Sequence, residues 1–132
     1  MLIDAHHHLW QYNPHDYTWM SDAMSALRRD FLIPDLESVT RAAGVEGTIV
    51  VQARQTLEET EWLLEVAANC PVILGVTGWV PLCQSHASAH LERFAQNPRL
   101  KSVRAAAVLP MRASSTPRLF QPSASLGCKC SA

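Results

Sequence analysis

The sequence lacks the features that mark several large classes of protein. No apolar run reaches the roughly 18 residues that cross a bilayer, and the first residues lack the basic flank and long apolar core of a signal peptide. In 132 residues, 11 basic side chains oppose 12 acidic ones, so no charge excess favours nucleic acid or an anionic membrane surface as a partner. We therefore expect a soluble, cytoplasmic protein.

The sequence also lacks a cysteine framework and a dinucleotide-binding motif. Its four cysteines do not form a disulfide pattern, because Cys70 and Cys83 lie apart and Cys128 and Cys130 lie together near the end. We expect all four to be reduced. No G-x-G-x-x-G motif follows the first apolar segment, which removes the main support for a Rossmann fold.

Two kinds of segment alternate along the chain. Helical patterns run from Pro34-Asp35 to Gly44, from a Thr56/Glu59 capping box to Cys70-Pro71, and from a Ser85 cap to Asn97-Pro98. Between them lie short apolar runs typical of buried strands, at residues 2–7, 47–53, 72–80 and 100–108. This order predicts a parallel α/β fold. Periodicity alone does not choose between a doubly wound sheet and a (β/α)₈ barrel.

Two regions depart from this alternation. The connection from Leu9 to Ile33 is long and rich in aromatic side chains, which predicts a packed lid. After Arg104 half of the 28 residues are Ala, Ser or Pro, and no acidic residue follows Glu92. We expect a globular part at residues 1–104 and an atypical tail, frameshifted or disordered, at residues 105–132.

Three consecutive histidines follow Asp4 and Ala5 at the end of the first predicted strand. Because side chains alternate along a strand, His6 and His8 share one side with Asp4, and His7 faces the other way. Two imidazoles so placed suit a divalent cation, most commonly zinc, although tetrahedral zinc needs at least three protein ligands. A cloning tag and a purely structural role are the alternatives.

The other histidines are less suited to a site. His86 and His90 are four residues apart on a predicted outer helix, a spacing that can imitate a metal pair. We interpret both as solvated surface residues, and His15 is also poorly placed for a ligand.

Five separated stretches carry a family resemblance. They read "IDAHHHLW", "YTWMSDAMSALRRDFLIPDL", "GVEGTIVVQARQTLEETEWLLEVA", "GVTGWVPL" and "NPRLKSVR". In this order they resemble the N-terminal half of the amidohydrolase-2 family of the amidohydrolase superfamily, in particular its branch of L-fuconolactone and L-rhamnonolactone hydrolases. The resemblance implies the N-terminal half of a (β/α)₈ barrel of TIM type, with about four βα units followed by an irregular tail.

The resemblance also implies which residues act. His6 and His8 match the first-strand H-x-H that contacts metal, most commonly zinc, or substrate. The positions that match substrate-binding strand ends are Gln52, Arg54, Trp79 and Arg104. Either arginine could bind substrate oxygens through its planar fork or pair with a neighbouring helix carboxylate. Trp79 could stack on a sugar face or plug the barrel.

The chain departs from the family pattern after Arg104. Family members continue there with a histidine, whereas this chain reads Ala105-Ala106-Ala107, and the general-base aspartate expected on the eighth strand has no candidate. We interpret the break as a shifted reading frame or a truncated gene product. Four strands do not close a barrel, so we expect a marginally stable protein or a homo-oligomer.

The expected activity follows from the resemblance. It is a hydrolase that opens a sugar lactone or a related cyclic ester by histidine-assisted attack of water. The alternatives are a non-catalytic, inactive fragment of such an enzyme and a related metal-dependent decarboxylase. In each case the partner is a small molecule.

Overall fold

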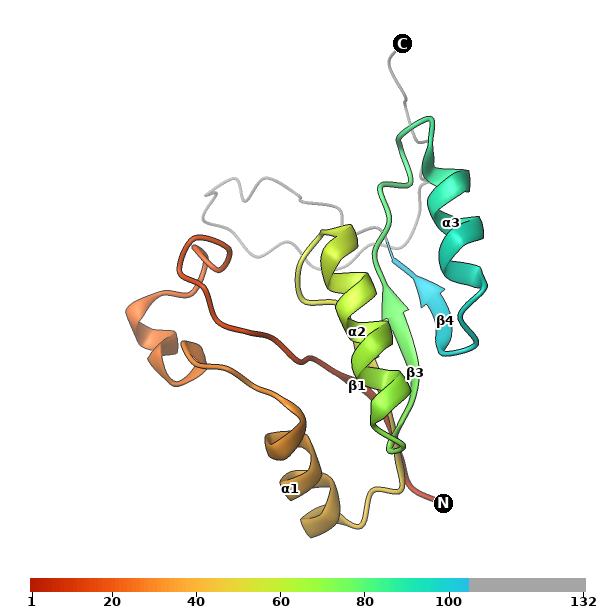
Figure 1. The fold of residues 1–132 in the computed structure, drawn as a ribbon. Helices are drawn as coiled ribbons and strands as arrows, with labels where there is room; N and C mark the ends of the chain where they lie inside the picture. Colours follow the sequence, from red (N-terminus) through yellow and green to blue (C-terminus); the bar gives the residue numbers. More distant parts are fainter. Residues whose placement is uncertain (105–132) are drawn as a thin grey trace, which may run out of the picture.

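The computed structural model describes residues 1–104, and the predicted tail at 105–132 lies outside this part (Figure 1). The strands are β1 (Ile3–His7), β2 (Gly47–Val51), β3 (Ile73–Gly78) and β4 (Leu100–Val103). The helices are the 3₁₀ helix η1 (Asp22–Leu27) and the α-helices α1 (Ile33–Ala43), α2 (Leu57–Asn69) and α3 (Ala87–Ala95). The predicted alternation is confirmed. No helix of the described part is long and apolar enough to cross a bilayer.

The order of the strands decides between the two predicted architectures. All neighbouring strands are parallel, and their order in the sheet is β1-β2-β3-β4, the order along the chain. A doubly wound sheet reverses its strand order at a switch point, whereas a barrel adds each strand beside the previous one. The described part is therefore a segment of a (β/α)₈ barrel.

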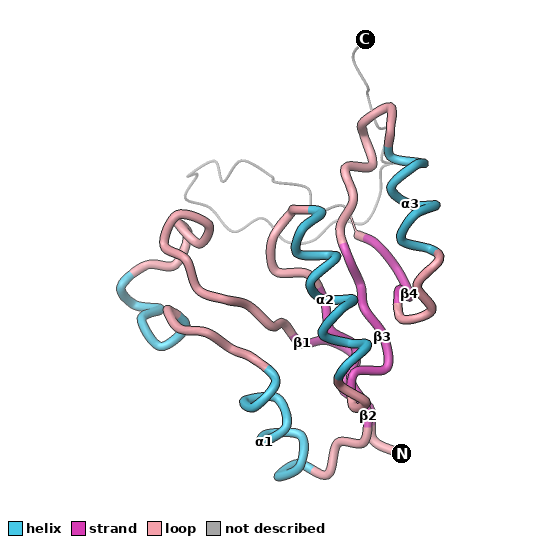
Figure 2. The backbone as a smooth tube through the Cα atoms, in the orientation of Figure 1, coloured by secondary structure: helices cyan, strands magenta, loops and turns pink. Residues whose placement is uncertain are grey.

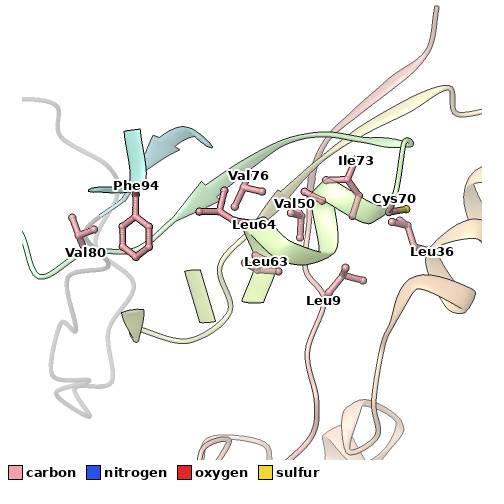
Figure 3. Packing of buried hydrophobic residues seen from close by; sticks show 11 residues of the cluster. Leu9, Leu36, Val50, Leu63, Leu64, Cys70, Ile73, Val76, Val80 and Phe94 are labelled. Atoms are coloured by element: carbon pink, nitrogen blue, oxygen red, sulfur yellow. The ribbon is translucent and has the colours of Figure 1, made fainter. Parts of the chain in front are cut away.

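The hydrophobic core lies on one face of this sheet (Figure 3). Val50 of β2 and Val76 of β3 pack in one cluster with residues of all three α-helices, so the helices cover the same face. Their contributions to the cluster are Leu36 from α1, Leu63, Leu64 and Ala67 from α2, and Phe94 from α3. Cys70, at the end of α2, is a buried free thiol in this cluster.

The other face of the sheet is more open among the described residues. Leu74 is 37% exposed there, and the hydroxyls of Thr77 and Ser102 hydrogen-bond at 2.7 Å in an exposed position. Gly47 allows close packing on this face, because a Cβ atom there would lie 2.3 Å from Leu74 and 2.8 Å from Ile3. In a complete barrel this face forms the interior.

The helix ends agree with the prediction at α1 and differ at α3. Pro34 lies in the first turn of α1, and Gly44 ends that helix in the left-handed conformation with φ 68°. The N-cap of α3 is His86, not the predicted Ser85, and the His86 side chain makes no capping hydrogen bond within residues 1–104. A backbone bond from Ala87 N–H to the Gln84 carbonyl, 3.0 Å long, supplies an acceptor instead.

The long connection between β1 and α1 is folded. We call residues 10–31 the aromatic segment. Its two ends are joined by backbone hydrogen bonds in both directions between Trp10 and Phe31, 3.1 and 2.9 Å long. Tyr17 and Met20 are buried, as the prediction of a packed connection requires. The segment leaves the sheet after β1, turns through η1 and returns at α1 (Figure 2).

Candidate active site

His6 and His8 lie together at the carboxyl end of β1. Their ring centroids are 5.0 Å apart with the planes at 75°, and the two Nε2 atoms are 3.2 Å apart. Catalytic groups of parallel α/β folds collect at this edge of the sheet. The expected juxtaposition of these two side chains is therefore present.

His8 is held by a backbone carbonyl of the neighbouring strand. Its Nδ1 lies 2.8 Å from the Val51 oxygen. A carbonyl oxygen only accepts hydrogen bonds, so Nδ1 of His8 carries the proton and its Nε2 lone pair accepts from His6 Nε2–H at 3.2 Å. Metal-binding histidines are commonly oriented in this way by a partner on the other ring nitrogen.

The spacing of the two imidazoles fits a shared zinc ion. Ligands at 2.0–2.1 Å in a tetrahedron are separated by about 3.3 Å, close to the 3.2 Å between the Nε2 atoms. Within residues 1–104, no group of three or more His, Cys, Asp or Glu side chains could hold a metal ion. The pair could therefore supply two ligands but not a complete set within the described residues.

Asp4 does not share the side of His6 and His8, contrary to the prediction. The register between β1 and β2 shifts between Asp4 and His7, and this irregularity changes the alternation of side chains. Asp4 Oδ2 consequently lies 3.9 Å from Nδ1 of His7, and both residues, together with His8, line another pocket with α1. Simple alternation failed here because a bulge was not visible in the sequence.

The surroundings of His7 differ from those of His6 and His8. Both ring nitrogens of His7 are buried, and neither has a hydrogen-bond partner among the described residues. Burial lowers the pKa of His7, and the nearby Asp4 carboxylate opposes that shift only in part. This buried environment agrees with the prediction that His7 faces away from His6 and His8.

A pocket of about 300 Å³ opens beside His8. Three predicted site residues line it: His8, Gln52 and Arg104. The aromatic segment supplies most of the other walls, which are Trp10, Tyr17, Trp19, Met20 and Leu27, and Ala53 completes the lining. The pocket therefore joins strand-end polar groups to an aromatic wall.

Gln52 and Tyr17 place buried polar groups in this region. Gln52 is 1% exposed, and its backbone N–H donates to the Thr77 carbonyl at 2.9 Å. Its side-chain Oε1 has no hydrogen-bond partner among residues 1–104. Tyr17 is 2% exposed, and its hydroxyl also lacks a hydrogen-bond partner in this described part of the chain. Burial, with a smaller contribution from Glu59, raises the pKa of Tyr17 to about 12. Sequence reasoning did not single out Tyr17, although the aromatic content of its segment was a signal.

Arg54 is engaged by two carboxylates and does not line the pocket. Its Nη1 lies 2.8 Å from Asp16 Oδ2, and its Nε lies 3.7 Å from Glu59 Oε1. The prediction left substrate binding and carboxylate pairing open for Arg54. In the described residues this guanidinium pairs with carboxylates.

Glu59 fastens the loop that carries Gln52 and Arg54. The expected capping box forms only in part: Thr56 Oγ1 accepts from Glu59 N–H at 3.1 Å, but the carboxylate reaches further back. Its Oε2 accepts from the backbone N–H groups of Ala53 and Arg54 at 3.0 and 2.6 Å. Burial raises the pKa of Glu59 despite these donors. This role was missed because spacing alone indicated a local cap.

Trp79 and Arg104 follow β3 and β4. Thr60 Oγ1 donates to the Trp79 carbonyl and accepts from its N–H, both at 2.9 Å, which ties this strand end to α2. Trp79 is not among the residues that line the pocket beside His8. The Arg104 backbone N–H donates to the Gly78 carbonyl at 3.1 Å, and its exposed side chain is at the pocket.

Together these features define a (β/α)₈-barrel protein whose candidate site lies at the carboxyl ends of its strands, the usual place for active sites in this fold. The chain belongs to the Amidohydrolase family, whose model matches residues 3–129. This match extends beyond Arg104.

Two curated relatives share substantial sequence identity with the chain. An L-fucono-1,5-lactonase of Burkholderia ambifaria is 38% identical over 102 residues, which are 77% of this chain and 35% of that protein. An L-fucono-1,5-lactonase of Burkholderia multivorans is 40% identical over 82 residues, which are 62% of this chain and 28% of that protein. The chain thus spans about a third of the length of these relatives.

Solved structures support the same architecture. A crystal structure of a Burkholderia multivorans amidohydrolase with bound zinc superposes with a TM-score of 0.73 at 34% identity, over 80% of this chain and 37% of that one. A crystal structure with bound HEPES, also from Burkholderia multivorans, gives a TM-score of 0.74 at 32% identity, over 80% and 36% of the two chains.

Proposed function

We propose that this chain contributes the first-strand metal pair and one pocket wall of a sugar-lactone hydrolase. The observation that carries the proposal is the arrangement of His6 and His8, whose Nε2 atoms lie 3.2 Å apart while Val51 orients the second ring. The names of the curated relatives support L-fucono-1,5-lactone or a related lactone as the substrate.

Zinc is the metal that the pair suits best. Both candidate ligands are imidazole nitrogens, a donor type that zinc favours, and a relative in the same family has been solved with zinc. Bound by these residues, zinc supplies Lewis acidity, which polarises a carbonyl and favours hydrolysis. The Val51 carbonyl keeps the proton of His8 on Nδ1, so Nε2 stays available as a ligand.

The pocket beside His8 suits a molecule with both hydroxyls and apolar C–H surfaces. Trp10 and Trp19 offer aromatic faces on which a sugar ring could stack. The Arg104 guanidinium is a fork of donors for ring or carbonyl oxygens, and Gln52 adds an amide at the same pocket. Stacking on Trp79 remains a prediction that rests on the resemblance alone.

Hydrolysis of L-fucono-1,5-lactone by the purified 132-residue chain tests this function. We expect zinc-dependent acid release, followed with a pH indicator, above the spontaneous rate. The variant His6→Ala/His8→Ala should reduce the enzymatic rate to background, because it removes both candidate ligands. The matched control is His86→Ala/His90→Ala on α3, which should retain the rate. Equal rates for the wild type and the His6/His8 variant would overturn the assignment.

A further inference from the structure

We propose that the Asp16–Arg54 ion pair positions the aromatic segment against the pocket, so that Arg54 sets ligand affinity without contacting the ligand. The chemical class of the ligand, a sugar-like ring, rests on the proposed function. The ion pair and the pocket wall are features of the described residues and stand independently of it.

The aromatic segment forms much of the pocket beside His8. Five of the nine lining residues come from it, and among them Tyr17 is buried whereas Trp19 is 59% exposed. The rings of these two residues meet edge to face, with centroids 6.4 Å apart. The place of this aromatic pair therefore decides the shape of one pocket wall.

Few side-chain hydrogen bonds connect the aromatic segment to the rest of the described fold. Contacts such as those of Arg28 with Met20 and Asp22 lie within the segment. In residues 1–104, two side-chain hydrogen bonds leave it: Arg29 to Asp35 at its base, and Arg54 to Asp16. Asp16 immediately precedes Tyr17, so this second contact acts directly on the pocket wall.

Arg54 is itself held in place by Glu59. Glu59, a buried residue of α2, accepts from the backbone N–H of Arg54 at 2.6 Å and lies 3.7 Å from its Nε. The ion pair thus connects the aromatic segment through the β2–α2 loop to a helix of the core. A pocket wall that is tied to a core helix has less freedom to lose when a ligand binds, which lowers the ordering cost of binding.

Ligand binding by the variants Asp16→Asn, Arg54→Gln and the double variant tests the proposal. The probe is L-fucose, a stable sugar whose ring corresponds to that of L-fucono-1,5-lactone, and the signal is tryptophan fluorescence, because Trp10 and Trp19 line the pocket. We expect each single variant to raise the Kd about 5-fold and the double variant to be no worse than either, as expected for two partners of one interaction. Arg93→Gln, which breaks a pair on the outer helices, should leave the Kd unchanged.

A second readout is independent of the ligand. Acrylamide quenching should detect greater access to the tryptophans in both single variants at a temperature well below unfolding, and Arg93→Gln should match the wild type. Additive losses of L-fucose affinity would show that Arg54 contacts the ligand and would overturn the proposal, as would unchanged quenching and Kd in Asp16→Asn. Absence of L-fucose binding by the wild type would overturn the ligand class, and quenching would still decide the role of the pair. Failed lactone hydrolysis with these effects intact would count only against the proposed catalytic function.

Discussion

Two regions of this molecule carry the same side-chain chemistry in different settings. The strand-end region has His6 and His8 with ring centroids 5.0 Å apart at 75°, and the outer helix α3 has His86 and His90 at 5.2 Å and 72°. Among the hydrogen bonds of residues 1–104, only the first pair has a ring oriented by a backbone carbonyl of another element, that of Val51. Ring proximity alone therefore does not make a candidate metal site, whereas an anchored pair at a sheet edge does.

The ion pairs repeat this contrast. Arg93 meets Glu61 at 2.6 Å between α3 and α2, with side chains 59% and 46% exposed. Arg54 meets Asp16 at 2.8 Å, with side chains 32% and 38% exposed. The buried Glu59 carboxylate also lies 3.7 Å from the Arg54 Nε. The pair on the outer helices has the shorter distance but the weaker expected effect, because water screens exposed charges.

The largest expected difference between the two regions is in zinc binding. His6→Ala/His8→Ala should weaken zinc affinity about 100-fold relative to the wild type, because both imidazole ligands are lost. His86→Ala/His90→Ala should change it little. Isothermal titration with zinc chloride, after removal of bound metal by a chelator, measures both. Equal losses in the two variants would show that the anchored geometry of His8 has no special role.

A smaller difference is expected in the free energy of unfolding when carboxylates of α2 are removed. Glu59→Ala leaves the N–H groups of Ala53 and Arg54 without their acceptor, which should cost about 2–4 kcal/mol. Glu61→Ala removes only a solvent-exposed pair and should cost below about 1 kcal/mol. Urea unfolding at pH 7 measures both values. If Glu59→Ala were no more destabilising than Glu61→Ala, the loop would not depend on this carboxylate. Glu59→Gln, which keeps one acceptor oxygen, should fall between the two.

The smallest expected effect depends on alkaline pH and concerns Tyr17 at the strand-end region. Its pKa is about 12 in the folded protein and about 10 when unfolded, so the folded state holds the phenol proton more tightly. The resulting stability is complete below pH 10 and is lost as the pH rises toward 12. Tyr17→Phe should show a shallower decline over this range, with a difference of up to about 2 kcal/mol in the free energy of unfolding.

At neutral pH the same substitution should be neutral or slightly stabilising, because the Tyr17 hydroxyl is buried without a partner. Parallel urea titrations at pH 7, 9 and 11 separate the two effects. A wild type and a variant with equal slopes between pH 9 and 11 would contradict the buried position of the phenol.

The helices and strands were predictable because the sequence patterns that specify them are local. Strands such as β2 are continuous apolar runs, and α1 starts at Pro34 and ends at Gly44 through backbone preferences that act over a few residues. The predicted side for Asp4 was wrong, because the bulge in β1 depends on pairing with a strand more than 40 residues away. The role of Glu59 was missed for a related reason. Its carboxylate, on a helix, accepts from the backbone of the preceding loop, whereas the sequence spacing also fits an ordinary cap.

The amino-acid sequence by itself determined the alternation of strands and helices, the shared side of His6 and His8, and the family resemblance, because these depend on residue order and period. Only the tertiary structure decided that the strands add sequentially as in a barrel, that Val51 orients His8, and that Arg54 faces Asp16 and Glu59. Each of these depends on contacts between segments distant in the chain, whose geometry is set by packing on the sheet and helices. The pocket beside His8 belongs to the same group, because the aromatic segment becomes a wall only when it folds back onto the strand ends.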